Sequence, residues 1–447
     1  MQQEKEILAL NAFDQGRVSS IDPALGEAVQ RRLRSFGKAS VLFYQEPIRM
    51  ARAEGVYMFD VDGRRYLDLY NNVPSVGHSH PRVVEAISRQ AGLLSTHTRY
   101  LNDVVDGYAE RLLATFPRGI NHLVLTCTGS EANDLALRVA KVATGRTGFI
   151  VTETAYHGNS TAVTDVSPSS RPGQPLPPHV RAVPAPEMYR NPVGDPGQRF
   201  AESVAAAITD LERSGFGFAA LLVDTIFSSD GIYADPAGFL APTVKLVHDR
   251  QGLFIADEVQ PGFGRTGAAM WGFARHGVVP DIVTMGKPMG NGFPMGGVAM
   301  RAALLDGFAA EVKYFNTFGG NPVAAAAGLA VLDVIEDEGL MQNALEAGRQ
   351  LMDGLREIGN RHVTIGDVRG AGLFIGLELV RDRDSKEPAA EHASLLINRL
   401  RQRGILIGAA GPFGNTLKIR PPLCFGKDHA DIFITACDEE LREIAAS

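Results

Sequence analysis

Cysteine is scarce in this chain of 447 residues, which contains only Cys127, Cys424 and Cys437 and has no C-x-x-C pair. An odd number of widely spaced cysteines argues against a disulfide framework and against a zinc ribbon. The motif GHSHP (77–81) has a His-x-His spacing, but no third ligand motif accompanies it, and a turn before a helix is the better interpretation. We therefore expect no bound metal and a protein of the reducing cytoplasm.

Long hydrophobic runs and dense clusters of lysine and arginine are missing as well. The longest apolar run, VAAAAGLAVL (323–332), is too short to cross a bilayer, and the N-terminal MQQEKEILAL lacks the basic and apolar segments of a leader peptide. The formal net charge at pH 7 is −7, which disfavours nucleic acid and anionic membranes as partners. A small molecule is therefore the expected ligand.

The sequence does contain short apolar runs that alternate with longer segments of helical period between about residues 120 and 300. Continuous apolar strands separated by helices predict an α/β fold, in which helices cover both faces of a doubly wound, mainly parallel sheet. Ligands of such sheets bind at the carboxyl ends of the strands. The runs are HLVLTC (122–127), GFIVT (148–152), AALLVD (219–224), LFIAD (253–257) and DIVTM (281–285).

Three parts are expected along the chain. Residues 61–325 form a large domain, residues 326–447 form a smaller α+β domain, and residues 1–60 form a segment that packs with the smaller domain. The segment Ser167–Pro196 holds nine of the 25 prolines and shows no periodic pattern, which predicts a long loop. Such a loop either borders a site or is a tolerated insertion.

Two of the predicted strands are followed by residues suited to a ligand with a phosphate and a planar ring. After the first run, Gly129 and Ser130 open a helix whose first N–H groups and dipole can bind an anion, although an ordinary serine-capped helix has the same pattern. After the second run, Tyr156 and His157 can form a platform on which a ring stacks, or a turn that is held by packing alone.

Two further strand ends carry a carboxylate and an amine. Asp257 ends the run 253–257, where burial is costly unless a structural cation, backbone amides or a protonated heterocycle nitrogen meets the carboxylate. Lys287 follows the run 281–285 within DIVTMGKPMGNGFP, where it is either solvated in a surface turn or held as a nucleophilic amine. Pyridoxal 5'-phosphate requires an anion cradle, a stacking face, an acid and a lysine together. The four strand ends therefore predict this cofactor.

A competing motif is GFGRTG (262–267), which satisfies the G-x-G-x-x-G pattern of dinucleotide-binding sites. Pro261 separates it from the preceding strand, and the segment AAMWGFARHG that follows is too short for the usual helix. Nicotinamide chemistry is therefore disfavoured. A binding protein without catalytic activity is disfavoured too, because both Asp257 and Lys287 are present.

Five segments carry a family resemblance that covers nearly the whole chain: TGSEAND, AYHG, FIADEVQPGFGRTG, DIVTMGKPMGNGFP and YFNTFGGNP. They resemble, in order and spacing, the signature segments of class III pyridoxal-phosphate-dependent aminotransferases. The resemblance implies a fold-type-I homodimer with shared active sites at the subunit interface. It also implies that Lys287 bonds the cofactor, that Asp257 meets the pyridine nitrogen, and that Gly129 and Ser130 bind the phosphate. The same resemblance places Tyr156 and Val259 on opposite faces of the ring and Gln260 near the phenolic oxygen. It further implies that Thr317 reaches the phosphate of the neighbouring subunit.

Other segments look most like the phospho-lyase branch of this family, whose members act on ethanolamine phosphate or phosphohydroxylysine: YNNVPSVGHSHP, STHTRYLND, VTMGKPMGNG and LKIRPPLCF. Where members that use dicarboxylates have an arginine and a glutamate, this chain has Lys418 and Asp224, and a lysine cannot grip a carboxylate bidentately. The resemblance implies elimination of phosphate, with release of an aldehyde and ammonia, and places Lys418, Arg420 and Asn72 at the substrate. Alternatively, Lys418 and Arg420 are charged side chains of an edge strand that have no role at the substrate. Transfer of the amine to pyruvate or another keto acid stays the alternative, because both reactions use the same cofactor residues.

Overall fold

The computed structural model describes residues 10–39 and 41–446. Residues 1–9, on which the leader prediction rests, lie outside this description, as do residue 40 of the predicted segment 1–60 and Ser447. Within the described ranges, the helices are all too short or too polar to cross a membrane.

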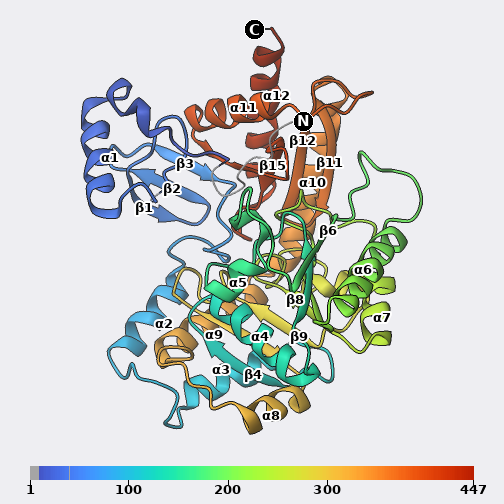
Figure 1. The fold of residues 1–447 in the computed structure, drawn as a ribbon. Helices are drawn as coiled ribbons and strands as arrows, with labels where there is room; N and C mark the ends of the chain where they lie inside the picture. Colours follow the sequence, from blue (N-terminus) through green and yellow to red (C-terminus); the bar gives the residue numbers. More distant parts are fainter. Residues whose placement is uncertain (1–9, 40, 447) are drawn as a thin grey trace.

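The centre of the fold is a seven-stranded sheet in the order β4-β10-β9-β8-β7-β5-β6 (Figure 1). The five apolar runs form β4, β5, β7, β8 and β9, as predicted. Strand β10 is antiparallel to both of its neighbours, and the strands from β9 to β6 are parallel. The predicted α/β fold with a mainly parallel sheet is therefore confirmed. The strands are β4 (His122–Thr126), β5 (Gly148–Thr152), β6 (Val180–Val183), β7 (Phe218–Asp224), β8 (Leu253–Asp257), β9 (Ile282–Met285) and β10 (Gly296–Met300).

Successive side chains of these strands point to opposite faces of the sheet, and each face has its own hydrophobic cluster. Val151 and Ile255 pack in one cluster, together with apolar residues of α4, while Ile150 and Phe254 pack in the larger cluster. This two-sided burial explains why the strands read as continuous apolar runs. The helices between the strands are α4 (Gly129–Thr144), α5 (Thr161–Asp165), α6 (Pro196–Arg213), α7 (Ala241–Asp249) and α8 (Ala302–Glu311).

The N-terminal and C-terminal parts of the chain meet in a four-stranded sheet of order β1-β2-β3-β13, where β13 pairs in parallel with β3. A second four-stranded sheet, β11-β12-β15-β14, is antiparallel and is called the C-terminal sheet below. The predicted domain boundaries stay predictions. The strands are β1 (Met50–Glu54), β2 (Tyr57–Asp60), β3 (Arg65–Asp68), β11 (Ile365–Ala371), β12 (Phe374–Leu379), β13 (Ile405–Leu406), β14 (Gly408–Ala410) and β15 (Thr416–Ile419). The remaining α-helices are α1 (Pro23–Phe36), α2 (Pro81–Ala91), α3 (Asp103–Leu113), α9 (Pro322–Asp337), α10 (Leu340–Gly359), α11 (Ala390–Gln402) and α12 (Lys427–Ala446).

Two strands differ from the sequence-based expectations. Strand β6 lies within Ser167–Pro196, so the prediction of an uninterrupted loop is wrong, and it stands at the sheet edge beside β5. Prolines flank this edge strand without interrupting it, which is where a sheet tolerates them. Strand β10 begins with two glycines, and a Cβ at Gly296 would lie 2.5 Å from the Thr128 carbonyl oxygen. Glycine therefore permits the close approach of β10 to the turn before α4.

Candidate active site

A cavity of about 200 Å³ lies at the carboxyl ends of the central strands. The structure brings eight of the nine predicted cofactor residues to it, because Thr317 is exposed and does not line it. The lining residues are Gly129, Ser130, Tyr156, His157, Asp257, Val259, Gln260 and Lys287, together with Thr128, Gly158 and Asp224.

The start of α4 forms the anion-binding side of this cavity. The Ser130 hydroxyl is already engaged with Asn159, because it accepts the Asn159 N–H at 3.1 Å and donates to the Asn159 side-chain oxygen at 3.0 Å. Gly158 has a φ of 140°, and a Cβ there would lie 2.4 Å from Ser130 Oγ, so glycine is needed for this turn to approach the helix. The backbone N–H groups of Gly129 and Ser130 have no acceptor within the helix and remain available for a phosphate.

Asp257, at the end of β8, is held by three hydrogen-bond donors. Its Oδ2 accepts from His157 Nδ1 at 2.7 Å and from Asn133 Nδ2 at 3.0 Å, and its Oδ1 accepts the Val259 N–H at 3.1 Å. Asn133 itself accepts a hydrogen bond from the Thr284 hydroxyl at 2.7 Å. These bonds fix the position of the buried carboxylate at the cavity, so Asp257 is suited to meet a ring nitrogen there.

Asn133 and Thr284 were not predicted as site residues. Asn133 lies on the buried face of α4, among alanines and leucines, and Thr284 interrupts an otherwise apolar run. A buried polar side chain needs a hydrogen-bond partner, so a polar residue at an apolar position is the signal that could have pointed to both.

Lys287 follows β9 after a single glycine, and its side chain extends into the cavity. The surrounding protein and the positive charge of Arg420 lower the pKa of Lys287, against the opposing effect of Asp257 and Asp224. A lowered pKa increases the fraction of unprotonated amine, which is the form that attacks an aldehyde.

The predicted substrate residues Arg420 and Asn72 meet beside this cavity. Arg420 Nη1 donates to Gln260 Oε1 at 2.6 Å and to Asn72 Oδ1 at 3.1 Å, and its guanidinium lies 4.6 Å from the centre of the Tyr70 ring. Arg420 Nε and Asn72 Nδ2 are buried and have no hydrogen-bond partner among the described residues.

Lys418, on β15, is the third predicted substrate residue. Burial and the charge of Arg420 lower the pKa of Lys418 well below its ordinary value, while Asp224 opposes this shift. Burial also raises the pKa of Asp224 to about 6, and the charge of Asp257 adds to the effect. Lys418 and Arg420 are 7% and 8% exposed, so neither is an ordinary charge on an exposed strand edge.

The fold and these groups together define a fold-type-I enzyme that uses pyridoxal 5'-phosphate. The buried carboxylate suits the ring nitrogen, the amine suits the aldehyde, and the free N–H groups at the start of α4 suit the phosphate. The family model described as Aminotransferase class-III matches residues 43–441. The chain therefore belongs to the class III aminotransferase family, whose cofactor is pyridoxal 5'-phosphate.

Relatives within this family carry two kinds of name. The chain is 39% identical to an alanine–glyoxylate aminotransferase 2-like protein of Drosophila melanogaster, covering 94% of this chain and 87% of the relative. It is also 39% identical to the ethanolamine-phosphate phospho-lyase homolog 1 of Caenorhabditis elegans, covering 93% of each. Among solved structures, a phospholyase from Arthrobacter in complex with phosphoethanolamine is 43% identical, with a TM-score of 0.90 over 93% of this chain and 99% of that chain.

Proposed function

We propose that the protein is a phospho-lyase that eliminates phosphate from ethanolamine phosphate, or from a related phosphorylated amine such as phosphohydroxylysine. Water then hydrolyses the enamine that elimination leaves, which releases an aldehyde and ammonia. The observation that carries this proposal is the pair of buried basic side chains, Lys418 and Arg420, near Lys287. Two cations suit a dianionic phosphate better than a single carboxylate. The phospho-lyase names among the relatives support the same assignment.

The bound cofactor supplies an electron sink for the carbon that bears the substrate's amine. In our proposal, the Lys287 amine would hold the cofactor by its aldehyde, and during the reaction it would accept the proton from the substrate carbon that bears the amine. Its lowered pKa favours the unprotonated form that this step requires. Asp257 would meet the cofactor's ring nitrogen, and Asn133 and His157 hold its carboxylate in position through hydrogen bonds.

At the other end of the substrate, Arg420 and Lys418 bind the phosphate and stabilise its negative charge as the carbon–oxygen bond breaks. Arg420 Nε and Asn72 Nδ2 are the donors left free for this contact among the described residues. Asp224 counters the charge of Lys418 before the substrate arrives, which reduces the cost of holding two cations close together.

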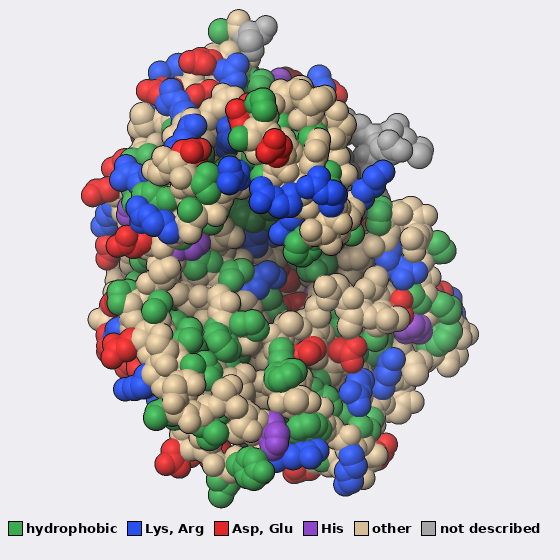
Figure 2. All heavy atoms as spheres, turned by 90° about the vertical axis from the view of Figure 1, so that its left-hand side faces the viewer, with side chains coloured by type: hydrophobic (Ala, Val, Ile, Leu, Met, Phe, Trp, Pro, Cys, Tyr) green, Lys and Arg blue, Asp and Glu red, His purple; other side chains and the backbone are tan. Residues whose placement is uncertain are grey.

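We further propose that the active unit is a homodimer in which Thr317 contacts the cofactor phosphate of the neighbouring subunit. Thr317 lies between exposed aromatic side chains and away from the cavity of its own chain. The His97 ring lies 5.2 Å from that of Tyr100 and 6.1 Å from that of Phe315, so segments 97–101 and 315–318 form one apolar patch. Figure 2 shows hydrophobic side chains gathered on the lower half of the face that carries α2 and α3. A patch of this kind is typical of a subunit interface. The exposed members are Tyr100, Leu101, Phe315 and Phe318.

The reducing cytoplasm stays the proposed compartment. Cys127, Cys424 and Cys437 are all unpaired in the structure, which fits a protein that does not depend on disulfides.

The deciding experiment is an assay of the purified holoenzyme with ethanolamine phosphate and no keto acid. We expect stoichiometric release of inorganic phosphate and acetaldehyde. The variant Lys418→Met should lower kcat/KM by about ten- to a hundredfold, because a charge-assisted phosphate contact contributes about 1.5–3 kcal/mol. Lys245→Met is the matched control, because Lys245 is an exposed lysine paired with Asp249 on the surface.

A second candidate function, transfer of the amine to pyruvate or another keto acid, is favoured by the aminotransferase name of the Drosophila relative. If the wild-type protein releases no phosphate from ethanolamine phosphate or phosphohydroxylysine but moves an amine onto pyruvate, this second function replaces the first.

A further inference from the structure

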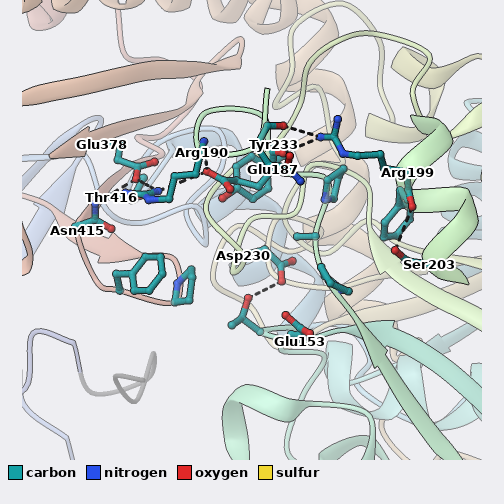
Figure 3. A pocket seen from close by; sticks show the side chains of 18 residues that line it. Glu153, Glu187, Arg190, Arg199, Ser203, Asp230, Tyr233, Glu378, Asn415 and Thr416 are labelled. Atoms are coloured by element: carbon teal, nitrogen blue, oxygen red, sulfur yellow. Dashed lines mark hydrogen bonds and ion pairs between the residues drawn. The ribbon is translucent and has the colours of Figure 1, made fainter. Parts of the chain in front are cut away.

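A second cavity, of about 380 Å³, lies between the seven-stranded sheet and the C-terminal sheet (Figure 3). On one side it is lined by the segments that follow β5 and β6 and by α6, and on the other by β12 and the segment between β14 and β15. The end of β7 and the loop after it together reach both cavities, because Asp224 lines the Lys287 cavity while Asp230 and Tyr233 line this one. Any change in how this loop meets the C-terminal sheet can therefore reach the active site.

Glu378, on β12, is the centre of a charged network in this second cavity. Its carboxylate is 2% exposed and forms ion pairs with Arg190, from the loop after β6, and with Arg369 Nη1 at 2.6 Å. Asn415 donates a further hydrogen bond to it at 3.2 Å. Burial opposes the charged form of Glu378, but the two arginines outweigh it and hold the pKa of this carboxyl below its ordinary value. Figure 3 shows Arg190 reaching across to Glu378 from the side of Glu187.

Arg369, on β11, links this charged network to the loop after β7. Its Nε and Nη2 donate to the Gly231 carbonyl oxygen at 2.9 and 2.7 Å, and Nε also donates to the Ile232 carbonyl oxygen at 3.0 Å. Beside this contact, a Cβ at Gly376 would lie 3.2 Å from Ile232 Cδ1, so glycine lets the loop touch β12 directly. The loop and the C-terminal sheet therefore meet in one defined arrangement.

The same strands carry the substrate-binding lysine. In the antiparallel register, Glu378 lies opposite Thr416, and Gly376 lies opposite Lys418. Residues two apart on a strand project from the same face, so Glu378 and Lys418 belong to the face that meets the loop. At the start of that loop, Asp224 counters the charge of Lys418.

We propose that Glu378, with Arg190 and Arg369, positions the C-terminal sheet so that Lys418 lies at the correct distance from Asp224 and Lys287. The three charged residues are positioning residues, since none of them lines the Lys287 cavity. A buried ion network is a weak source of stability, but it can specify one arrangement of the elements it joins. The inference rests on the proposed function in that Lys418 binds the anionic end of the substrate.

The test is steady-state kinetics of the holoenzyme variants Glu378→Gln, Arg190→Met and Arg190→Lys with ethanolamine phosphate. We expect Glu378→Gln and Arg190→Met to raise KM by about tenfold or more while kcat falls less, because displacement of a binding group by about 1 Å costs up to about a hundredfold. Arg190→Lys should recover part of the loss, since it keeps the charge. The absorption spectrum of the bound cofactor and its retention on dialysis should stay as in the wild type.

The matched control is Arg381→Met, which removes an arginine paired with Glu387 and Glu391 on the solvent side of the same part of the chain. The proposal is overturned if Glu378→Gln changes KM no more than this control does. It is also overturned if kcat falls as much as KM rises and cofactor retention is lost as well, because that pattern marks a merely structural role. Should Glu378→Gln fail to fold, Arg190→Met decides by the same criteria, because Arg190 is partly exposed on a loop.

Failure of the proposed function gives a different result. In that case the wild-type enzyme itself releases no phosphate. The same KM comparison among the variants is then made with the amine donor that the wild type does accept, and it still supports or overturns the positioning role of Glu378.

Discussion

Replacing Asn133 with leucine tests how the Asp257 carboxylate is held. The Asn133 amide donates to Asp257 Oδ2 at 3.0 Å and to the His157 carbonyl oxygen at 2.7 Å, and it accepts the Thr284 hydroxyl at 2.7 Å. Leucine has nearly the same size and shape, so the packing of α4 changes little while all three hydrogen bonds are lost.

The expected loss can be worked out from these bonds. A hydrogen bond to a charged group contributes about 1.5–3 kcal/mol and a neutral one about 1 kcal/mol, so Asn133→Leu should lower the free energy of unfolding by about 4 kcal/mol. Asp257 keeps the bonds from His157 and from the Val259 N–H but is held less firmly, and we expect kcat to fall by about ten- to a hundredfold. The control Thr284→Val removes one neutral bond and should cost about 1 kcal/mol with little change in kcat.

The assay is urea unfolding of the cofactor-free protein at one fixed protein concentration, combined with steady-state kinetics of the holoenzyme. Fixed concentration matters because the stability of an oligomer depends on it. If Asn133→Leu matches Thr284→Val in both unfolding midpoint and kcat, the Asn133 amide does not hold Asp257, and the argument from the network is wrong.

Three further predictions concern single residues, and a fourth concerns the dimer. Borohydride reduction of the holoenzyme and peptide mapping should place the pyridoxyl adduct on Lys287; an adduct on another lysine contradicts the assignment. In the cofactor-free protein, Arg420→Gln should raise the pKa of Lys287, because a neighbouring cation is removed, so reductive methylation of Lys287 at pH 8 should slow; an unchanged rate would show that burial alone sets the pKa. Asp257→Ala should slow turnover by about a thousandfold, or about 4 kcal/mol of barrier, whereas a change within tenfold would make the carboxylate structural. Light scattering under assay conditions should find a dimer, and a fully active monomer would refute the role of Thr317.

The positions of the central strands and of the cofactor residues could be predicted from sequence because the relevant signals are local. An apolar run of five residues next to a glycine or an acidic residue marks a buried strand and its end, and parallel strands bring their ends to one edge. Asp257 and Lys287 each mark the end of such an apolar run in the sequence, and because the strand ends meet at one edge, both residues line one cavity. The helical spacing of the apolar residues after Gly129 likewise predicts that α4 begins there.

Pairing between distant segments was decided only by the tertiary structure. Strand β6 lies within a proline-rich segment and β10 begins with glycines, so neither has a strong strand pattern, and each forms because a neighbouring strand offers a hydrogen-bonding edge. The contacts of Asn133 with Asp257, of Arg420 with Gln260, and of Arg190 with Glu378 join residues more than a hundred positions apart. Local period carries no information about such partners, because a buried polar group can be satisfied by any donor or acceptor that the packing brings within reach. Sequence patterns were thus enough to predict five of the seven central strands, the cofactor and the residues at the strand ends. The contacts that orient these residues depend on how distant segments pack, including the C-terminal sheet against the central one.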